Sequence, residues 1–497
     1  MIELIERATS FSGNLAIHCE GMDYTYSQLL EVSESISAHL LKDCKDLDEA
    51  RVAFLIEPGF SYVAIQWGIW RAGGIAVPLC VKHPLPALEY VLDDTSASYV
   101  IYSADFEPVL RPLIEQNGNR FIAFESLKSG NGVLPDVYEE RRAMILYTSG
   151  TTGKPKGVVT THNNIKAQVT SLVNSWEWSQ SDHILNVLPM HHVHGIINAL
   201  CCPLWVGACC EFLPRFDTDE VFEVFIRGKV NLFMAVPTIY HKLIARFEVT
   251  SAERQKEIEA SLKNFRLMVS GSAALPVTVL EKWREISGHT LLERYGMTEM
   301  GMAISNPYRG ERKPGYIGKL LHGVEVRLAS DQNEVELGVP GEIQVKGEII
   351  FKEYWNKPVA TQETFTFDGW FKTGDIAVQD EEGYYKILGR NSVDIIKSGG
   401  YKISALEIEE VLRTHEAVKD CAVVGIHDDE WGELIVAGLL VSDSSLDLEQ
   451  LSNWVRNVLP GYKAPRKYMI LEDLPRNAMG KVTKNELKEL FKHHLNK

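Results

Sequence analysis

Residues 147–157 read Tyr-Thr-Ser-Gly-Thr-Thr-Gly-Lys-Pro-Lys-Gly and form a segment rich in hydroxyl groups, glycines and lysines. Glycines let the backbone approach a ligand and turn its N–H groups toward it, while Ser, Thr and Lys side chains add donors and positive charge. This combination suits the phosphate groups of a nucleotide, although the spacing differs from that of the P-loop. The alternative for this segment alone is a mobile surface loop without a ligand.

A second polar cluster, Glu-Arg-Tyr-Gly-Met-Thr-Glu at residues 293–299, follows a predicted strand at residues 290–292. In parallel α/β sheets, ligands bind outside the carboxyl ends of the strands. A tyrosine can stack on a purine, a threonine can donate to a phosphate, and a carboxylate can hold Mg²⁺ beside phosphate oxygens. The cluster therefore predicts a second part of a nucleotide site.

Two further segments present single charges. Residues 369–375 end in Asp375, which we expect in a turn where it can accept hydrogen bonds from ribose hydroxyls, and Arg390 follows fifteen residues later. Residues 475–481 form a predicted tight loop that presents Lys481. For each charge alone, a solvated turn is the simpler interpretation, but four such elements in this order favour one common site.

The composition limits the class of function. The 497 residues correspond to roughly three domains of about 150 residues each, and a hydrophobic content of 45% is ordinary for a globular protein. The net charge of -16 argues against nucleic acid or an anionic membrane as the main partner, because both require a basic surface. A local basic site for an anionic metabolite remains compatible with this charge.

The N-terminal segment and the cysteines predict a reducing, cytoplasmic location. The first residues lack the order of a signal peptide and the Arg/Ser bias of a transit peptide. The apolar stretch at residues 196–213 contains Pro203 and Glu211 and is interpreted as buried helix and strand rather than as a membrane span. Its adjacent cysteine pairs, at 201–202 and 209–210, lack metal-ligand spacing, so packed free thiols are expected.

Apolar runs that predict strands alternate with helical patterns over the first ~300 residues, which indicates parallel α/β architecture. Strands are expected at residues 184–188, 231–236, 266–269 and 290–292, and helices at residues 237–247 and 275–286. From about Gly315, short strands punctuated by glycine predict a small β-rich unit, with examples at residues 341–347 and 383–389.

The residues after Gly389 predict a compact α+β domain. Ser404-x-x-Glu407 and Thr483-x-x-Glu486 match capping boxes that open helices, and strands are expected at residues 418–426 and 434–441. The predicted fold class is therefore α/β. A large domain at residues 1–389 would hold two α/β subdomains and a small β-rich subdomain, followed by a small α+β domain at residues 390–497.

Taken together, these motifs resemble those of the acyl-adenylate-forming superfamily, which includes acyl-CoA synthetases, firefly luciferases and nonribosomal adenylation domains. The resemblance extends over essentially the whole chain. It implies a phosphate loop made of Thr148, Ser149, Gly150, Thr151, Thr152 and Lys156. It also implies that the rest of the nucleotide is bound by Gly271, Ser272, Ala273, Tyr295 and Gly296, with Asp375 and Arg390 at the ribose.

The resemblance further implies individual roles. Tyr295 would stack on adenine, Thr298 would contact the α-phosphate, and Glu299 would bind Mg²⁺. Lys481 would bridge the substrate carboxylate and the nucleotide. A carboxylate would attack the α-phosphate of ATP and expel pyrophosphate, with Lys481 and Mg²⁺ stabilising the phosphoryl oxygens. A thiol would then attack the acyl-adenylate and release AMP.

In the superfamily the small C-terminal domain rotates between these two half-reactions. The resemblance implies that the rotation brings residues 397–401 to the site, with Lys397 among the catalytic residues and glycines that can border a pantetheine tunnel. The hinge departs from the usual pattern. Ser392 stands where many members have Asp or Lys, and the segment before Asp394 is one residue longer. The exact hinge residue is therefore left open.

The residue before Tyr295 bears on the choice of acid. Many members of the superfamily have a small residue there, facing the acyl pocket, whereas this chain has Arg294. A buried unpaired cation beside an apolar tail is costly, but a guanidinium can bind a second substrate carboxylate through two hydrogen bonds. The alternative is a structural ion pair between Arg294 and Glu293 or another acid.

Two histidines within residues 188–195 support the same interpretation. His192 matches the superfamily's gating histidine near the reacting carboxylate, and His194 stands where relatives use an apolar residue that contacts the acyl group. With Ser270 and Ser272, His194 predicts a short hydrophilic pocket. The alternative is that His194 is an ordinary core histidine with its hydrogen bonds satisfied.

Arg294 and His194, with residues 214–217 and 475–481, make the chain resemble the malonyl-CoA synthetase family. The resemblance implies an acid–thiol ligase that uses ATP, Mg²⁺ and coenzyme A to convert malonate to malonyl-CoA, AMP and pyrophosphate. Neither nucleic acid nor a membrane is an expected partner. The alternatives are a ligase for methylmalonate or another short acid, acyl transfer to a carrier protein, and a non-catalytic nucleotide sensor.

Overall fold

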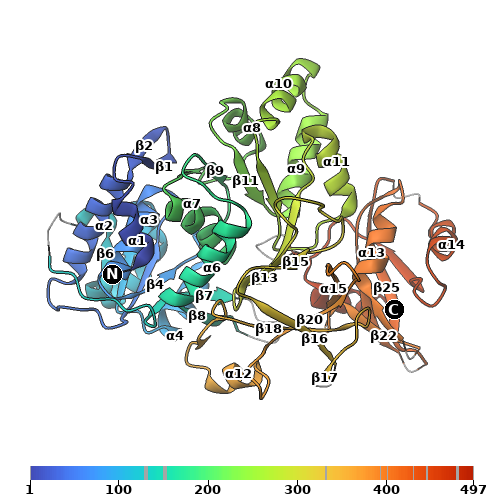
Figure 1. Cartoon of the computed structure of the whole chain (residues 1–497). Helices are drawn as coiled ribbons and strands as arrows, with labels where there is room; N and C mark the ends of the chain where they lie inside the picture. Colours follow the sequence, from blue (N-terminus) through green and yellow to red (C-terminus); the bar gives the residue numbers. More distant parts are fainter. Residues whose placement is uncertain are drawn as a thin grey trace.

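The computed structural model describes residues 2–127, 132–148, 154–330, 333–391, 393–399, 401–428, 430–443, 446–476 and 481–495. Two large, mainly parallel sheets come first, a smaller antiparallel sheet follows, and a fourth sheet belongs to the C-terminal domain (Figure 1). This arrangement confirms the predicted α/β fold class, including its β-rich part and its α+β C-terminal part.

The seven-stranded sheet has the order β19-β8-β7-β4-β3-β5-β6. Its strands are β3 (Arg51–Leu55), β4 (Ile75–Pro78), β5 (Tyr99–Tyr102), β6 (Phe121–Ala123), β7 (Arg142–Thr148), β8 (Lys156–Thr161) and β19 (Glu353–Tyr354). The strands from β7 to β6 pair in parallel, whereas β8 returns antiparallel to β7. Of the predicted phosphate loop, Thr148 is the last residue of β7 and Lys156 is the first residue of β8.

The nine-stranded sheet has the order β15-β14-β13-β12-β11-β9-β10-β1-β2. Its strands are β1 (Leu15–Cys19), β2 (Met22–Thr25), β9 (His183–Asn186), β10 (Cys209–Phe212), β11 (Leu232–Ala235), β12 (Leu267–Ser270), β13 (Leu292–Met297), β14 (Gly301–Ser305) and β15 (Lys319–Leu320). The strands from β13 to β1 are parallel. β11 and β12 are buried at every residue because helices cover the sheet, and this burial explains their continuous apolar runs.

The helices of the large domain lie between these strands in the chain. They are α1 (Glu3–Thr9), α2 (Tyr26–Leu40), α3 (Phe60–Arg71), α4 (Leu85–Asp94), α5 (Glu107–Asn117), α6 (His162–Ser175), α7 (Cys202–Val206), α8 (Thr218–Ile226), α9 (Pro237–Glu248), α10 (Ala252–Leu262), α11 (Val277–Ser287) and α12 (Pro358–Glu363). The predicted helices at 237–247 and 275–286 correspond to α9 and α11. Trp67, Trp70, Trp176 and Trp283 are fully buried and anchor the packing of helices on the two sheets.

The apolar stretch at residues 196–213 is buried helix and strand, as predicted. It begins in the π-helix η4 (His194–Cys201), continues through α7 and ends in β10. All eight cysteines are free thiols, and all except Cys44 are buried. Across the described residues, no helix is long and apolar enough to cross a membrane, and no group of three or more His, Cys, Asp or Glu residues could hold a metal ion.

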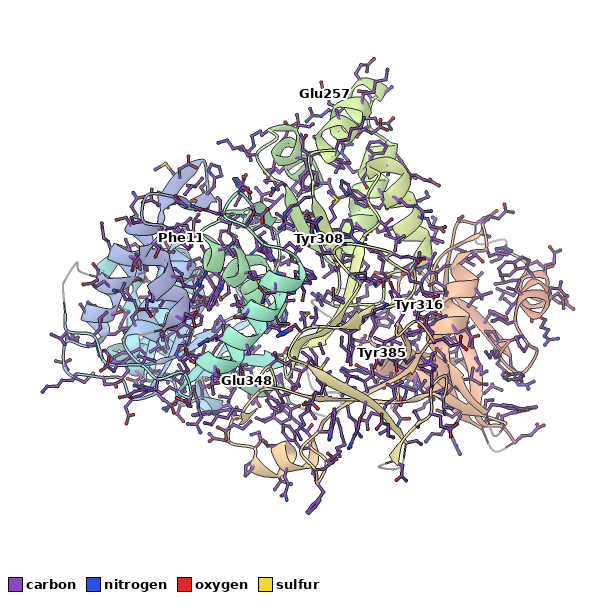
Figure 2. The ribbon with its side chains drawn as sticks, in the orientation of Figure 1. Phe11, Glu257, Tyr308, Tyr316, Glu348 and Tyr385 are labelled. Carbon is purple, nitrogen blue, oxygen red and sulfur yellow. The ribbon has the colours of Figure 1, made fainter. Side chains whose placement is uncertain are left out.

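The third sheet has the order β17-β16-β18-β20-β21 and is antiparallel. Its strands are β16 (Glu325–Ser330), β17 (Asn333–Glu334), β18 (Gly341–Lys346), β20 (Phe371–Gln379) and β21 (Tyr385–Arg390). A bridge between Gly318 and Tyr385 joins it to the segment before β15, and Figure 2 labels Tyr385 at this junction.

Two predicted positions are wrong. The sequence predicts that residues 293–299 follow a strand, but β13 extends through Met297, because β12 pairs with it at residues 292–293 and β14 pairs with it at residues 294–297. The sequence also predicts Asp375 in a turn, but Asp375 lies inside β20. Pairing between β20 and β21 keeps this segment extended and places Arg390 directly opposite Asp375.

The C-terminal domain packs three helices on a five-stranded sheet. Its elements are β22 (Ile395–Ser398), β23 (Tyr401–Ser404), α13 (Ala405–Arg413), β24 (Val418–Asp428), β25 (Gly432–Val441), α14 (Leu448–Val458), β26 (Lys467–Ile470) and α15 (Lys484–Leu495). Ser404 Oγ accepts from the Glu407 N–H and caps α13, as predicted, while the Glu407 side chain pairs with Lys463. Helix α15 begins at Lys484, directly after Thr483, as predicted, but the predicted capping bond is absent because the Thr483 hydroxyl is buried and has no partner among the described residues.

Candidate active site

The predicted ribose residues form one paired cluster with the predicted adenine platform. The Asp375 carboxylate accepts a hydrogen bond from the Tyr295 hydroxyl at 2.5 Å and another from Arg390 Nε at 3.0 Å. Asp375 and Tyr295 are buried. The strand pairing that sets Asp375 opposite Arg390 therefore builds this cluster from β13, β20 and β21.

The predicted metal residue lies near the predicted phosphate loop. The hydroxyl of Tyr354 donates to Glu299 Oε1 at 2.9 Å, and Lys156 Nζ lies 4.9 Å from the centre of the Tyr354 ring. Lys156 in turn stands opposite Thr148 in the β7–β8 hairpin. Burial raises the pKa of the Glu299 carboxyl, so a nearby cation would favour its ionised form.

Some predicted loop positions cannot be placed. Ser149, Gly150, Thr151 and Thr152 lie outside the described residues, as does Ser392 near the hinge. Thr298 follows the C-terminal end of β13 and is partly exposed, adjacent to Glu299. The roles predicted for all of these residues stay predictions.

The segment after β12, residues 271–273, packs against the side chain of Arg294. Ser272 has a left-handed backbone with φ of 69°, and a Cβ added at Gly271 would lie 2.4 Å from Cζ of Arg294. A larger residue at 271 would therefore displace the guanidinium. Ala273, the last of the predicted residues here, is exposed. At Gly296, a Cβ would lie 2.0 Å from the carbonyl oxygen of Gly301, so the β13–β14 hairpin requires glycine there.

Arg294, which the sequence predicts to face the acyl group, has no acidic partner in the part of the chain that the structure describes. Its side chain is buried at 4% exposure, and its terminal nitrogen lies 3.5 Å from Ser272 Oγ. Its Nε has no hydrogen-bond partner, and among the described residues no acid forms an ion pair with it. The ion pair with Glu293 is excluded as an explanation, since neighbouring residues on a strand point to opposite faces.

Other buried polar groups near Arg294 also lack partners. His194 Nδ1 lies 3.2 Å from Ser272 Oγ, whereas its Nε2 has no partner in the described structure. The buried Ser270 Oγ has none either, but strand pairing sets Ser270 beside Glu293, on the face of the sheet opposite to Arg294, so its role in the acyl pocket stays a prediction. Buried polar groups in folded proteins are normally hydrogen-bonded, so these atoms indicate a pocket that a polar ligand or water completes.

Sequence reasoning missed Asn198. This residue is fully buried, and both its amide oxygen and its amide nitrogen lack partners among the described residues. Asn198 follows His194 by four residues on the π-helix η4, so both side chains lie on similar faces of that helix. The only signal in the sequence is one amide within an otherwise apolar run.

The two histidines are uncharged at neutral pH. Burial, followed by the charge of Lys481, lowers the pKa of His192 to about 4. Burial, followed by the charge of Arg294, lowers the pKa of His194 well below its usual range. Neutral imidazoles can accept as well as donate hydrogen bonds, so they suit a site that already holds several cations.

Lys481 lies within the electrostatic reach of the other predicted residues. Lys481 is exposed as a whole residue, but desolvation of its ammonium group lowers the pKa of that group, and the charges of Arg390 and Arg294 add to this effect while Asp375 opposes it. The structure therefore brings Lys481 together with His192, Arg294 and the Asp375 cluster. The predicted residue Lys397 is separate: its side chain is exposed on β22, and its backbone N–H donates to Glu433.

Comparisons with known proteins agree with this geometry. Residues 4–355 match the AMP-binding enzyme family and residues 407–481 match the AMP-binding enzyme C-terminal domain. The malonate–CoA ligase ACSF3, mitochondrial, of Xenopus laevis is 44% identical over 98% of this chain and 91% of its own length.

Two solved structures cover nearly the whole chain. ATP-bound MatB from Rhodopseudomonas palustris is 31% identical, with a TM-score of 0.90 over 99% of both chains. A malonyl-CoA ligase ternary product complex with methylmalonyl-CoA and AMP bound is 33% identical, with a TM-score of 0.70 over 96% of this chain and 100% of the other. The chain belongs to the AMP-binding enzyme family.

Proposed function

We propose that this protein is an ATP-dependent acid–thiol ligase that converts malonate and CoA to malonyl-CoA, AMP and pyrophosphate. The observation that carries this proposal is the buried guanidinium of Arg294, which has no acidic partner among the described residues. A cation without a partner in a dry pocket is costly, and an anionic substrate group would remove that cost. The relative from Xenopus laevis is itself named a malonate–CoA ligase.

Malonate fits because it carries a carboxylate at each end of one methylene group. One carboxylate would pair with Arg294, while His194 and Asn198 would supply further hydrogen bonds. The other carboxylate would lie toward His192 and Lys481. A fatty acid would leave these polar groups without partners, and that penalty would reject it.

The first half-reaction would take place between Lys481 and the nucleotide cluster. An oxygen of the free carboxylate attacks the α-phosphorus of ATP, the bond from that phosphorus to the bridging oxygen breaks, and pyrophosphate leaves. Lys481, Arg390 and Lys156 supply positive charge for the phosphoryl oxygens, although the protein as a whole is acidic. His192 is neutral and can orient the attacking carboxylate without repelling the nearby cations.

Glu299 fits the predicted Mg²⁺. It is a carboxylate whose ionised form burial disfavours, and Tyr354 is the side chain that donates to it. Mg²⁺ is commonly held by one or two carboxylates together with substrate phosphates rather than by a cage of protein ligands. When bound, the ion would neutralise charge on the phosphate oxygens.

The second half-reaction would require the C-terminal domain to move. We propose a division into residues 1–389 and 390–497, with the smaller part rotating so that residues 397–401 approach the acyl-adenylate. The CoA thiol then attacks the acyl carbonyl and AMP leaves. The present arrangement agrees better with the ATP-bound relative than with the product complex, since the TM-scores are 0.90 and 0.70 at similar identity.

A panel of carboxylic acids, scored by AMP release in the presence of ATP, Mg²⁺ and CoA, tests the proposal. We expect malonate to give the highest kcat/KM, with methylmalonate lower and with acetate and butyrate far lower. Equal or better activity with butyrate would contradict the dicarboxylate assignment. Malonyl transfer to a phosphopantetheinyl carrier protein in preference to CoA would instead support the carrier-loading alternative.

The cytoplasmic location predicted from the sequence stays a prediction, and the name of the Xenopus laevis relative includes the word mitochondrial. Cell fractionation with an antibody against the native protein measures it directly. We expect the protein in the cytosolic fraction, and recovery with an organelle marker would contradict that expectation.

A further inference from the structure

A hydrogen bond joins the C-terminal domain to the large domain away from the hinge. The carboxylate of Glu410, on α13, accepts from the backbone N–H of Val277 at 3.0 Å, across 133 residues of sequence. Val277 is the first residue of α11, which belongs to the nine-stranded sheet's helical layer. In Figure 1, α13 lies just beyond the end of α11.

Helix α11 has no N-terminal cap of its own. Its capping position holds Pro276, whose side chain cannot accept a hydrogen bond, and its first turn has no acidic residue. The free N–H groups and the helix dipole make such an end favourable for a carboxylate. Glu410 supplies that carboxylate from the other domain, so the contact depends on how the two domains are arranged.

A second acidic residue, Glu293, lies near the contact between Glu410 and α11. Burial raises the pKa of the Glu293 carboxyl to about 8. A hydrogen bond from the Gly315 N–H opposes this shift, and the nearby charge of Glu410 adds to it. Glu293 therefore favours its protonated, uncharged form at neutral pH. It does not compete with Glu410 for the positive end of α11.

We propose that Glu410 is a positioning residue that latches the C-terminal domain onto α11 in the arrangement used for adenylation. The inference rests on the proposed function, because it concerns the balance between the two half-reactions. In the present arrangement Lys481, carried by the same domain, lies within reach of Arg390, Asp375 and Arg294. Rotation for thiol transfer would break the contact between Glu410 and Val277, so the latch opposes that rotation.

The substitution Glu410→Ala tests the latch in both half-reactions. We expect malonate-dependent exchange of pyrophosphate into ATP to fall about fivefold, which corresponds to a helix cap of about 1 kcal/mol. Transfer from preformed malonyl-adenylate to CoA should be unchanged or faster. An equal loss in both half-reactions, or no change in either, would overturn the proposal.

Two further variants separate the latch from general effects on the domain. Glu407→Ala, on the same helix, removes the ion pair with Lys463 inside the C-terminal domain and should leave the ratio of the half-reactions unchanged. Pro276→Asp gives α11 a cap of its own, so Glu410→Ala should have no additional effect in that background. A full additional loss there would contradict capping as the cause.

A distance measurement tests the latch independently of the substrate. Spin labels at Glu257→Cys on α10 and Glu449→Cys on α14 would span the two domains, after Cys44→Ser removes the one exposed thiol. With ATP present, Glu410→Ala should deplete the distance population that dominates in the parent protein. An unchanged distribution would overturn the latch. Absence of malonate-dependent exchange in the parent enzyme would instead contradict the proposed function alone.

Discussion

The nucleotide end and the acyl end of the site differ in how their polar groups are satisfied. At the nucleotide end, Asp375 already accepts hydrogen bonds from Tyr295 and Arg390. At the proposed acyl end, Arg294 Nε and His194 Nε2 are buried without partners in the described structure. Arg294 and Tyr295 are neighbours on the same strand, β13, so the difference does not come from the rigidity of the supporting element.

This difference suggests that one end of the site positions the nucleotide and the other end selects the acid. A carboxylate that is already paired, such as Asp375, is held in a fixed position by its protein partners. A ligand can bind to it without having to supply the hydrogen bonds that offset its burial. Groups left unpaired carry a desolvation cost that only a complementary substrate removes, because an unsuitable ligand leaves them buried and unsatisfied. The acyl end should therefore decide which acid reacts, and the nucleotide end should support every acid equally.

Substitution of Arg294 by Ala should have the largest effect on activity, because it removes the cation at the proposed acyl end. Loss of one partner from a buried charge pair costs enough to lower malonate-dependent pyrophosphate exchange roughly 10²- to 10³-fold. Butyrate-dependent exchange should be spared. The Arg294→Lys variant keeps the charge but not the two-pronged geometry and serves as the control. Unchanged use of malonate by Arg294→Ala would remove the basis for a dicarboxylate substrate.

Substitution of Asp375 by Asn should act at the nucleotide end and affect every acid alike. The change removes a charge-assisted acceptor from both Tyr295 and Arg390, so we expect the KM for ATP to rise about 10- to 100-fold. Steady-state kinetics with malonate and with methylmalonate measure this effect. The ratio of kcat/KM for the two acids should stay the same, and a marked change in that ratio would show that the two ends are not separate.

Much of this contrast could be predicted from the sequence. The segments around Tyr147, Tyr295, Asp375 and Lys481 predict a common site because their residue types suit a nucleotide, and Arg294 stands out as a charge in an apolar setting. Local patterns could not show that Asp375 lies in a strand opposite Arg390, because that register depends on pairing between two strands.

Two other features depend on tertiary structure. Asn198 looks like an isolated amide in an apolar run, and only the fold shows that both its polar atoms are buried without partners in the described structure. The contact between Glu410 and Val277 joins residues of different domains, and no local pattern links them. Residue spacing in the sequence therefore cannot show which polar groups are buried without partners or which residues of the two domains are in contact.

Substitution of Asn198 by Leu should sharpen the comparison with a smaller effect. Leucine has the same branching at Cγ and is larger, but it cannot hydrogen-bond, so the pocket would become less favourable for a carboxylate and more favourable for a methyl group. We expect about a tenfold loss of kcat/KM for malonate, as for one hydrogen bond to a charged group, and a gain for butyrate. Asn198→Asp is the opposing control, since a negative charge should repel malonate. Equal losses for malonate and butyrate would indicate only a packing defect.

Substitution of Glu293 by Gln should change stability rather than catalysis, although Glu293 is adjacent to Arg294 in the chain. Burial raises the pKa of Glu293 from its ordinary value of 4.5 to about 8, so between these pH values the folded state holds a proton that the unfolded state has lost. Stability should therefore fall as pH rises through this window, by at most about 1.4 kcal/mol per pH unit from this group. Glutamine cannot ionise, so the variant should gain Tm relative to the parent protein at pH 8 and little at pH 5, measured by thermal unfolding. A constant difference at both pH values would show that the Glu293 carboxyl titrates normally, and a large loss of malonate activation would place it in the site with Arg294.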